Sequence, residues 1–215
     1  RDRIKFASDN VTGACPEVLD AILKANDGDR TPYGNDEISK SLQDKFSEIF
    51  EKEVIVFPTS SGTAANALAL STMTPSFGNI YCHKLSHINV DECGAPEFYT
   101  GGAKLVTLKG DDGKITAEEL NKSISGKGIV HHTQPSSVSI TQLCETGEAY
   151  KLDEIKKISE IAHNHKLNMH MDGARFANAL VSLNCSPAEM TWKSGIDVLS
   201  FGATKNGCLA AEAII

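Results

Sequence analysis

The chain has 215 residues, of which 40% are hydrophobic and 23% are charged. At this length about 70% of the unfolded chain's surface can be buried, so length and composition favour a globular protein and disfavour disorder. The 21 basic and 28 acidic residues give a formal net charge of −7. This balance disfavours binding to nucleic acids or anionic membranes, because both need a basic surface. No apolar run approaches the ~20 residues of a membrane span, and residues 1–30 have no signal-peptide core.

Six cysteines are scattered along the chain without a C-x-x-C motif or paired spacing. In a chain of this length such a distribution is typical of reduced thiols, which persist in a reducing compartment. We therefore expect a cytoplasmic protein.

Turn-forming residues dominate residues 1–35, which we interpret as an N-terminal arm. One helix is expected within it, because Pro16 and Glu17 open a segment with apolar residues at helical spacing. Residues 36–215 contain no linker or repeat, and we interpret them as a single large domain.

Predicted helices and strands alternate along residues 36–215. In chain order we expect a helix over 39–50, a buried strand over 54–57, a helix over 64–70, strands over 79–82 and 103–108, a helix opened by the capping box of 116–119, a strand led by 128–130, a helix over 152–163, a strand over 167–171, a helix opened by 186–189, and a strand over 198–201. This alternation predicts an α/β fold with a mostly parallel sheet between layers of helices. The chain stops inside an apolar run that reads as a strand, so we expect a further C-terminal part in the whole protein.

Chemically useful residues follow three of the predicted strands, where ligands gather in parallel sheets. Small hydroxyl residues and a glycine occupy positions 60–63, before a helix. A helix N-terminus of this kind suits a phosphate, although a simple helix cap would use the same residues.

The other two groups are an acid and a lysine. Asp172 ends an apolar strand, where a carboxylate needs a cation, either Arg175 or a cationic ligand atom. Lys205 follows the last predicted strand and is either a solvated loop residue or an amine that can form a Schiff base. A phosphate site, a buried acid and a lysine at one sheet edge are together what pyridoxal phosphate requires.

Several stretches of the chain resemble the threonine aldolase and β-eliminating lyase family, and in particular its branch of low-specificity L-threonine aldolases that includes phenylserine aldolases. The resemblance runs from about Phe6 to the last residue. It is carried by Ser8-Asp-Asn-Val-Thr-Gly13, Tyr33-Gly-Asn-Asp36, Ser61-Gly-Thr-Ala-Ala-Asn66, His87-Ile-Asn-Val-Asp-Glu-Cys-Gly-Ala-Pro-Glu97, His170-Met-Asp-Gly-Ala-Arg175 and Ser200-Phe-Gly-Ala-Thr-Lys205.

The resemblance implies the large domain of a fold type I pyridoxal-phosphate enzyme, with the small C-terminal domain of the family lying beyond position 215. It implies cleavage of an L-β-hydroxy-α-amino acid, such as threonine, allo-threonine or phenylserine, to glycine and an aldehyde. It also implies a homodimer or homotetramer with active sites at the subunit interface. β-Elimination or transamination on the same fold, and an inactive interaction domain, remain alternatives.

The resemblance further implies four catalytic residues. Lys205 would hold the cofactor's aldehyde, and Asp172 would pair with the protonated ring nitrogen. Arg175 would lie near the cofactor's phenolic oxygen or the substrate carboxylate. His87 would stack on the pyridine ring, and a neutral imidazole there could act as a base near the substrate hydroxyl.

Binding residues are implied in the same way. Ser61, Gly62 and Thr63 would hold the cofactor phosphate. Ser8 would help to bind the substrate carboxylate, and Tyr33 would reach into the site of a neighbouring subunit.

One segment departs from the family pattern. Many members have Glu-Asn-Thr-His-Asn where, by our alignment, residues 131–135 read His-His-Thr-Gln-Pro. Gln134 would then replace a histidine near the substrate hydroxyl, which favours a larger substrate such as phenylserine over threonine.

A metal site is the competing interpretation of the histidines. His83 and His87 are four residues apart, a spacing that metal sites use on helices. No glutamate lies between them and His83 follows a strand, so we expect no metal.

Overall fold

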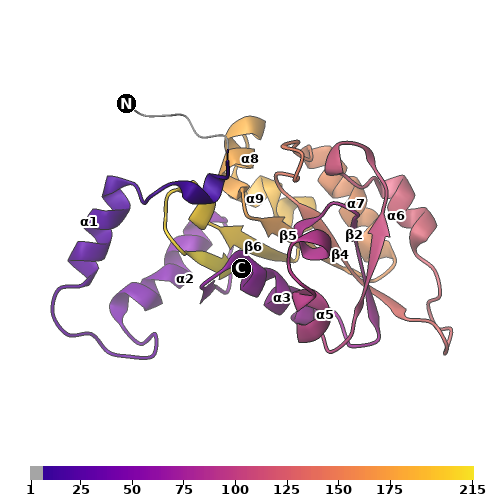
Figure 1. Cartoon of the computed structure of the whole chain (residues 1–215), viewed down its shortest axis with the longest axis horizontal. Helices are drawn as coiled ribbons and strands as arrows, with labels where there is room; N and C mark the ends of the chain where they lie inside the picture. The colour runs from indigo at the N-terminus through magenta and orange to yellow at the C-terminus, as the bar shows by residue number, and fades with distance from the viewer. Residues whose placement is uncertain (1–6) are drawn as a thin grey trace.

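The computed structural model of the protein describes residues 7–215, so Phe6 and the start of the predicted arm lie outside the described residues. Within that range the strands form a seven-stranded sheet in the order β1-β7-β6-β5-β4-β2-β3 (Figure 1). The strands are β1 (Phe57–Thr59), β2 (Gly78–His83), β3 (Lys104–Leu108), β4 (Gln134–Thr141), β5 (Asn168–Gly173), β6 (Val198–Gly202) and β7 (Glu212–Ile214). Neighbours from β3 through β2, β4 and β5 to β6 are parallel, whereas β7 is antiparallel to both β6 and β1. The expected α/β fold with a mostly parallel sheet is confirmed.

Helices precede, connect and cover the strands. They are α1 (Pro16–Ala25), α2 (Glu37–Ile49), α3 (Gly62–Met73), α4 (His87–Val90), α5 (Ala95–Tyr99), α6 (Ala117–Ser123), α7 (Leu152–Asn164), α8 (Phe176–Leu183) and α9 (Pro187–Met190), with short 3-10 turns η1 (Asp9–Val11), η2 (Asp111–Gly113), η3 (Trp192–Ser194) and η4 (Thr204–Asn206). No helix within residues 7–215 is long and apolar enough to cross a lipid bilayer.

The two faces of the sheet differ in chemistry. On one face Met169 and Met171 of β5 join a large apolar core with side chains of α2, α7 and α8. On the other face the side chains of the central strands are polar and lie under α3. There the buried His170 ring is within 2.9 Å of the hydroxyls of both Ser139 on β4 and Ser200 on β6. Burial lowers the pKa of His170 to about 4, so this ring is neutral at neutral pH.

Helix α3 lies against this polar face and is itself largely buried. Ala65, Ala67 and Ala69 are fully buried, and small side chains of this kind let a helix backbone approach a sheet closely. Helix α3 is also packed against α5. The polar face of the sheet is therefore covered by a buried, close-packed helix.

Most of the elements that the sequence predicts are confirmed, with small shifts at their ends. Helix α2 begins at Glu37 because Asp36 caps it by accepting a hydrogen bond from the Ser39 amide. Both segments expected to carry a capping box open helices. Residues 186–189 form the reciprocal box, whereas at 116–119 the Thr116 side chain accepts from the Glu119 amide.

The strand expected over residues 54–57 is wrong. Strand β1 begins only at Phe57 and pairs on one side only, with β7, at the edge of the sheet. Ile55 and Phe57 are exposed, whereas Val54 packs against the apolar core, so the run over 54–57 is a half-buried segment rather than the buried strand that we expected.

The strand expected to begin at 128–130 is also wrong. Residues 126–133 form turns, and β4 starts at Gln134. The Gln134 side chain fixes these turns by accepting from the Gly128 amide at 2.8 Å and donating to the His132 carbonyl at 2.8 Å.

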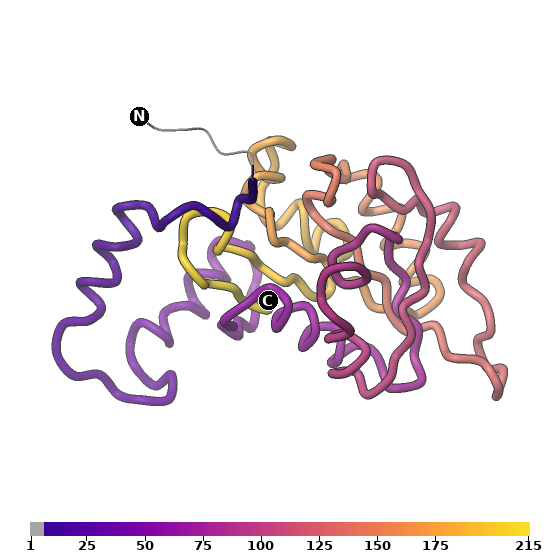
Figure 2. Tube along the Cα trace, in the orientation of Figure 1, coloured from indigo at the N-terminus to yellow at the C-terminus, as the bar shows by residue number. Residues whose placement is uncertain are grey.

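Helix α1 extends away from the sheet at one end of the molecule (Figures 1 and 2). Its apolar residues Leu19, Ile22 and Leu23 are exposed. The division into an arm of residues 1–35 and a domain of residues 36–215 stays a prediction.

Substitution of Gly202 tests the close approach of backbones at the end of β6. A Cβ atom at Gly202 would lie 2.6 Å from the Ala174 Cα and 2.8 Å from its carbonyl oxygen. We expect Gly202→Ala to lower the free energy of unfolding by roughly 1–3 kcal/mol. Gly13→Ala is the control, because nothing lies within 4 Å of its Cβ position. Equal urea midpoints for the two variants would contradict the close contact.

Candidate active site

A cavity of about 250 Å³ lies where the carboxyl ends of β5 and β6 meet the N-terminus of α3. The lining residues come from segments that are far apart in the chain, as expected for a site at the edge of a parallel sheet. They are Asn10, Ser60, Ser61, Gly62, Thr63, Asn66, His87, Glu92, Asp172, Ala174, Thr204, Lys205 and Glu212. Six of the residues predicted from the sequence are thus brought together.

The N-terminus of α3 forms one wall of this cavity. Ser61 caps the helix by accepting a hydrogen bond from the Ala64 amide at 3.2 Å. The amides of Gly62 and Thr63 lie in the first turn, where a helix offers its N–H groups and the positive end of its dipole. A Cβ atom at Gly62 would meet only the Glu212 Oε2 atom, at 3.8 Å, so the space in front of the helix is open. This wall suits an anion such as phosphate.

Asp172 forms the floor of the cavity at the end of β5. It is only 4% exposed, and its carboxylate accepts hydrogen bonds from the Asn66 side chain at 2.9 Å and the Ala174 amide at 3.0 Å. Of the two partners considered for it, Arg175 is excluded in this structure, because the Arg175 guanidinium pairs with Asp9. Among the described residues Asp172 makes no ion pair, which leaves its charge to a cationic ligand atom.

Lys205 lies in η4, in the loop that joins β6 to β7, and its side chain lines the cavity. Glu212 on β7 lines it as well. Burial and the charge of Asp172 raise the pKa of Glu212, although hydrogen bonds to Thr204 and the charge of Lys205 oppose the shift. The Lys205 amine thus shares the cavity with the carboxylates of Asp172 and Glu212.

His87 lies at the N-terminus of α4 and also lines the cavity. Its Nδ1 atom is 2.8 Å from the Oε1 atom of Glu92, whose side chain is fully buried. The hydrogen bond to Glu92 raises the pKa of His87 above its usual value, and the charges of Asp172 and Glu145 act in the same direction against partial burial.

Arg175 lies beside the cavity and does not line it. Its Nε atom donates to Asp9 at 2.6 Å, and its Nη1 atom is 3.9 Å from the Glu145 carboxylate. Burial alone would raise the pKa of Asp9, but the hydrogen bond and charge of Arg175 and the charge of Lys205 together lower it. The N-terminal segment is thereby fastened to the edge of the site.

Ser8 and Tyr33 are not brought to this cavity. The Ser8 hydroxyl caps η1 by accepting from the Asn10 amide, and Asn10 rather than Ser8 lines the cavity. Tyr33 is 96% exposed in the connection between α1 and α2. Its expected place in a neighbouring subunit's site stays a prediction.

The structure corrects the interpretation of Gln134. This residue begins β4, at the amino end of the strand, and its side chain is bonded within the turns of residues 126–132. The cavity lies at the carboxyl edge, so Gln134 is at the opposite edge of the sheet from Asp172. Residues 142–145 are the ones that follow β4 at the carboxyl edge.

Four functional candidates were missed by the sequence analysis: Asp9, Asn66, Glu92 and Glu212. Asp9, Asn66 and Glu92 all fall inside the stretches that carry the family resemblance, so the resemblance contained a signal for them. Glu212 follows the last predicted strand in an apolar context, and only the antiparallel return of β7 brings it to the site.

His87, Glu92 and Asp172 have ligand atoms within 4.8 Å of one another, as a metal site would require. Glu92 Oε1, however, already contacts the His87 ring and accepts from Asn66, which also donates to Asp172. The three side chains are thus joined in a hydrogen-bond network. His83, the other half of the spacing considered above, is instead bonded to the Gly110 carbonyl and the Leu85 amide.

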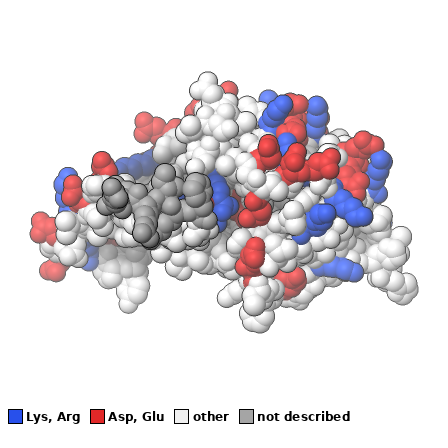
Figure 3. Space-filling view, turned by 45° about the horizontal axis from the view of Figure 1, so that its top comes forward, with Lys and Arg blue, Asp and Glu red and all other residues white. Residues whose placement is uncertain are grey.

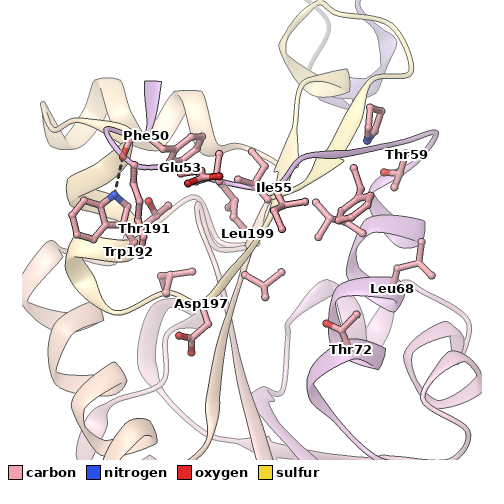
Figure 4. Close-up of a pocket in the computed structure, with 18 of the residues that line it drawn as sticks. Phe50, Glu53, Ile55, Thr59, Leu68, Thr72, Thr191, Trp192, Asp197 and Leu199 are labelled. Carbon is pink, nitrogen blue, oxygen red and sulfur yellow. Dashed lines mark hydrogen bonds between the residues drawn. The ribbon is translucent and has the colours of Figure 1, made fainter. Parts of the chain in front are cut away.

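A larger cavity of about 760 Å³ lies at the other edge of the sheet, near the amino end of β6 (Figure 4). Its walls are mainly apolar, including Phe50, Ile55 and Leu199. Trp192 is fixed there by donating to the Phe50 carbonyl at 2.7 Å. We place the chemistry in the smaller cavity, where an amine, an imidazole and three carboxylates converge.

Residues 5–215 match the family model described as β-eliminating lyase. The chain belongs to the β-eliminating lyase family. It is 46% identical to the low specificity L-threonine aldolase of a Pseudomonas species over 98% of its own length, and 43% identical to the protein of the same name from Pseudomonas aeruginosa. Among solved structures, a threonine aldolase of Leishmania major superposes with a TM-score of 0.90 at 29% identity over 97% of the chain.

The chain spans 61% of the length of each of these three proteins. Nearly all of this chain is thus matched by part of a longer family member. The fold of the β-eliminating lyase family therefore holds for the described residues.

The residues of the cavity fit pyridoxal phosphate, the cofactor that the resemblance implies. The open helix N-terminus suits its phosphate, and the buried Asp172, which makes no ion pair within residues 7–215, suits the cationic ring nitrogen. Lys205 lines the same cavity and supplies an amine, and the His87 ring supplies a flat face.

Acidic and basic side chains of the described residues are interspersed on the face that Figure 3 shows. With a net charge of −7, selective attraction of anions depends on local groups such as the N-terminus of α3.

Glu212 provides a test of the anion site, because its carboxylate faces the N-terminus of α3. We expect Glu212→Gln to bind inorganic phosphate about fivefold more tightly than the wild type at pH 8, since one negative charge is removed. The gain should shrink as the pH falls, because protonation neutralises Glu212 in the wild type and its raised pKa starts this early. Calorimetric titration measures both effects, with the exposed Glu118→Gln as control. Equal affinities of Glu212→Gln and Glu118→Gln for phosphate at pH 8 would contradict an anion site at the N-terminus of α3 beside Glu212.

Proposed function

We propose that the protein cleaves L-β-hydroxy-α-amino acids to glycine and an aldehyde with pyridoxal phosphate as cofactor. The observation that carries the proposal is the convergence of Lys205, Asp172 and the N-terminus of α3 on one cavity. Membership of the β-eliminating lyase family and 46% identity to a low specificity L-threonine aldolase support it.

Bound pyridoxal phosphate supplies an electron sink for the bond that breaks at the substrate Cα atom. The amides of Gly62 and Thr63, with Ser61, would hold its phosphate. Asp172 would keep the proton on the ring nitrogen, and its hydrogen bonds from Asn66 and Ala174 fix the carboxylate for this purpose. The Lys205 amine would bind the aldehyde carbon and yield it to the substrate amine.

His87 is proposed as the base of the reaction. Its Nδ1 atom contacts Glu92, so the second ring nitrogen, Nε2, is the one that can exchange a proton with the substrate. Nε2 would take the proton of the β-hydroxyl, directly or through a water molecule, as the Cα–Cβ bond breaks. Arg175 would lie at the edge of the site and contribute positive charge near the substrate carboxylate, with its guanidinium oriented by Asp9.

Three substrates fit the proposal: threonine, allo-threonine and phenylserine. The names of the relatives favour threonine with loose selectivity. The preference for phenylserine depended on Gln134, whose position removes that argument.

β-Elimination is the second candidate, because the matching family takes its name from it. It would release the β-substituent with ammonia and an oxo acid from a substrate that carries a leaving group. Product analysis separates the two reactions, since only the aldolase forms glycine.

Assembly and location are also proposed. A homodimer or homotetramer would bury the exposed Leu19, Ile22 and Leu23 of α1 and the exposed Tyr33, with the active sites near the subunit interface. All six cysteines lie in the described part of the chain and are free thiols, which supports a reducing compartment such as the cytoplasm.

Absorption spectroscopy tests the cofactor and the reaction together. Addition of pyridoxal phosphate to the chain should produce a visible band that Lys205→Ala lacks, because the variant has no amine for the aldehyde. Threonine or phenylserine should then release glycine and an aldehyde. Asp172→Asn is the matched control: it should keep the band and lose at least about a hundredfold in turnover, because an amide does not hold the ring proton. A band of equal strength in Lys205→Ala would contradict the proposed lysine.

A further inference from the structure

Glu92 lines the cavity beside His87 and is the only carboxylate within the described residues that forms a hydrogen bond with that ring. The His87 Nδ1 atom is 2.8 Å from Glu92 Oε1, with the two residues five positions apart across the end of α4. The His87 side chain is 29% exposed and the Glu92 side chain 0% exposed. Both residues line the cavity, but only the His87 side chain is accessible to solvent.

Glu92 is itself held in place from the opposite side. Its Oε1 atom also accepts a hydrogen bond from the Asn66 side chain at 2.8 Å, and the same amide donates to Asp172 at 2.9 Å. Asn66 lies on the buried helix α3 and is 2% exposed. One side-chain amide thus uses its two hydrogens to join the carboxylates of Glu92 and Asp172.

A buried carboxylate of this kind determines which ring nitrogen carries the proton. Ionised Glu92 offers only acceptor atoms, so the contact requires a proton on Nδ1. In the neutral ring Nε2 then carries a lone pair, which is the form that a base needs. A rotated ring or the other tautomer would lose this contact and leave the Glu92 charge with only the Asn66 amide as donor.

We propose that Glu92 is a positioning residue that fixes the orientation and the Nδ1–H tautomer of His87, so that Nε2 faces the substrate hydroxyl as an acceptor. This inference rests on the proposed function, because only there is His87 the base. In this role Glu92 acts through the His87 ring and is not itself the base.

The same contact sets the proton affinity of the ring. The hydrogen bond to Glu92 is the largest of the effects that raise the pKa of His87, and burial opposes it. The charges of Glu92 itself, Asp172 on β5 and Glu145 after β4 raise the pKa further. Lys205 is the cationic side chain that shares the cavity with these acids. Removal of the Glu92 charge should therefore lower the pKa of His87 more than removal of the Glu145 charge.

Nuclear magnetic resonance of the ring nitrogens tests this directly in the chain without cofactor. We expect neutral wild-type His87 as the Nδ1–H tautomer. Glu92→Gln should lower its pKa by roughly one unit or more, and Glu145→Gln should lower it by clearly less. Glu92→Gln keeps the size and the acceptor oxygen, and circular dichroism confirms the fold of each variant. An Nε2–H tautomer in the wild type, or an unchanged pKa in Glu92→Gln, would overturn the proposal.

The pH dependence of turnover, measured with pyridoxal phosphate added, separates positioning from a purely structural effect. A base works only when deprotonated, so the acidic limb of kcat/KM should move to lower pH in Glu92→Gln by the same shift as the His87 pKa. If Glu92→Gln is active and the acidic limb of its kcat/KM profile stays at the wild-type pH, the positioning role of Glu92 is overturned while the proposed function stands. If neither the wild type nor the variant releases glycine, the proposed function is overturned, and with it the catalytic role of the contact. The tautomer and pKa of His87 would still show whether Glu92 fixes the ring.

Discussion

The arrangement of the site depends on one buried charge, the carboxylate of Asp172. It lies at the end of a central strand, nearly inaccessible to water, and is held by one amide from the neighbouring helix and one from the chain that follows. An isolated buried carboxylate costs several kcal/mol, so its retention implies a compensating cation. Arg175 is adjacent in the sequence but pairs with Asp9. The fold thus keeps a negative charge for a ligand rather than neutralising it internally.

The scaffold around this charge explains how it is kept in position. Along β5 the side chains alternate between the apolar core and the face under α3, and His170 and Asp172 share that second face. The polar row of Ser139, His170 and Ser200 satisfies its own hydrogen bonds across three strands. Helix α3 closes over the row with alanines and brings both Asn66 and its own N-terminus to the cavity. One helix therefore supplies the anion site and the amide that links Asp172 to Glu92.

Much of this could be predicted from the sequence, because periodicity and cap residues are local signals. The alternation of helices and strands, the caps at Thr116 and Ser186, and Lys205 and Asp172 at strand ends were all read correctly. The errors have a common cause, which is that edge position and loop geometry are not local. Residues 54–57 are apolar, but Ile55 and Phe57 are exposed at the edge of the sheet. Gln134 aligns with a site residue of the family, although it begins β4 at the opposite edge of the sheet from the cavity. The contacts of Glu92 with His87 and Asn66 join segments whose proximity only the folded chain reveals.

Reductive trapping tests the central claim most directly, namely that one cavity gathers an amine for the cofactor above a buried acid. The chain is incubated with pyridoxal phosphate, reduced with borohydride and digested, and the labelled peptide is identified by mass spectrometry. The account predicts one predominant label, on Lys205, which inorganic phosphate diminishes by competing for the N-terminus of α3. Labels spread over the 17 lysines in proportion to exposure, or a predominant label on a lysine other than Lys205, would contradict it.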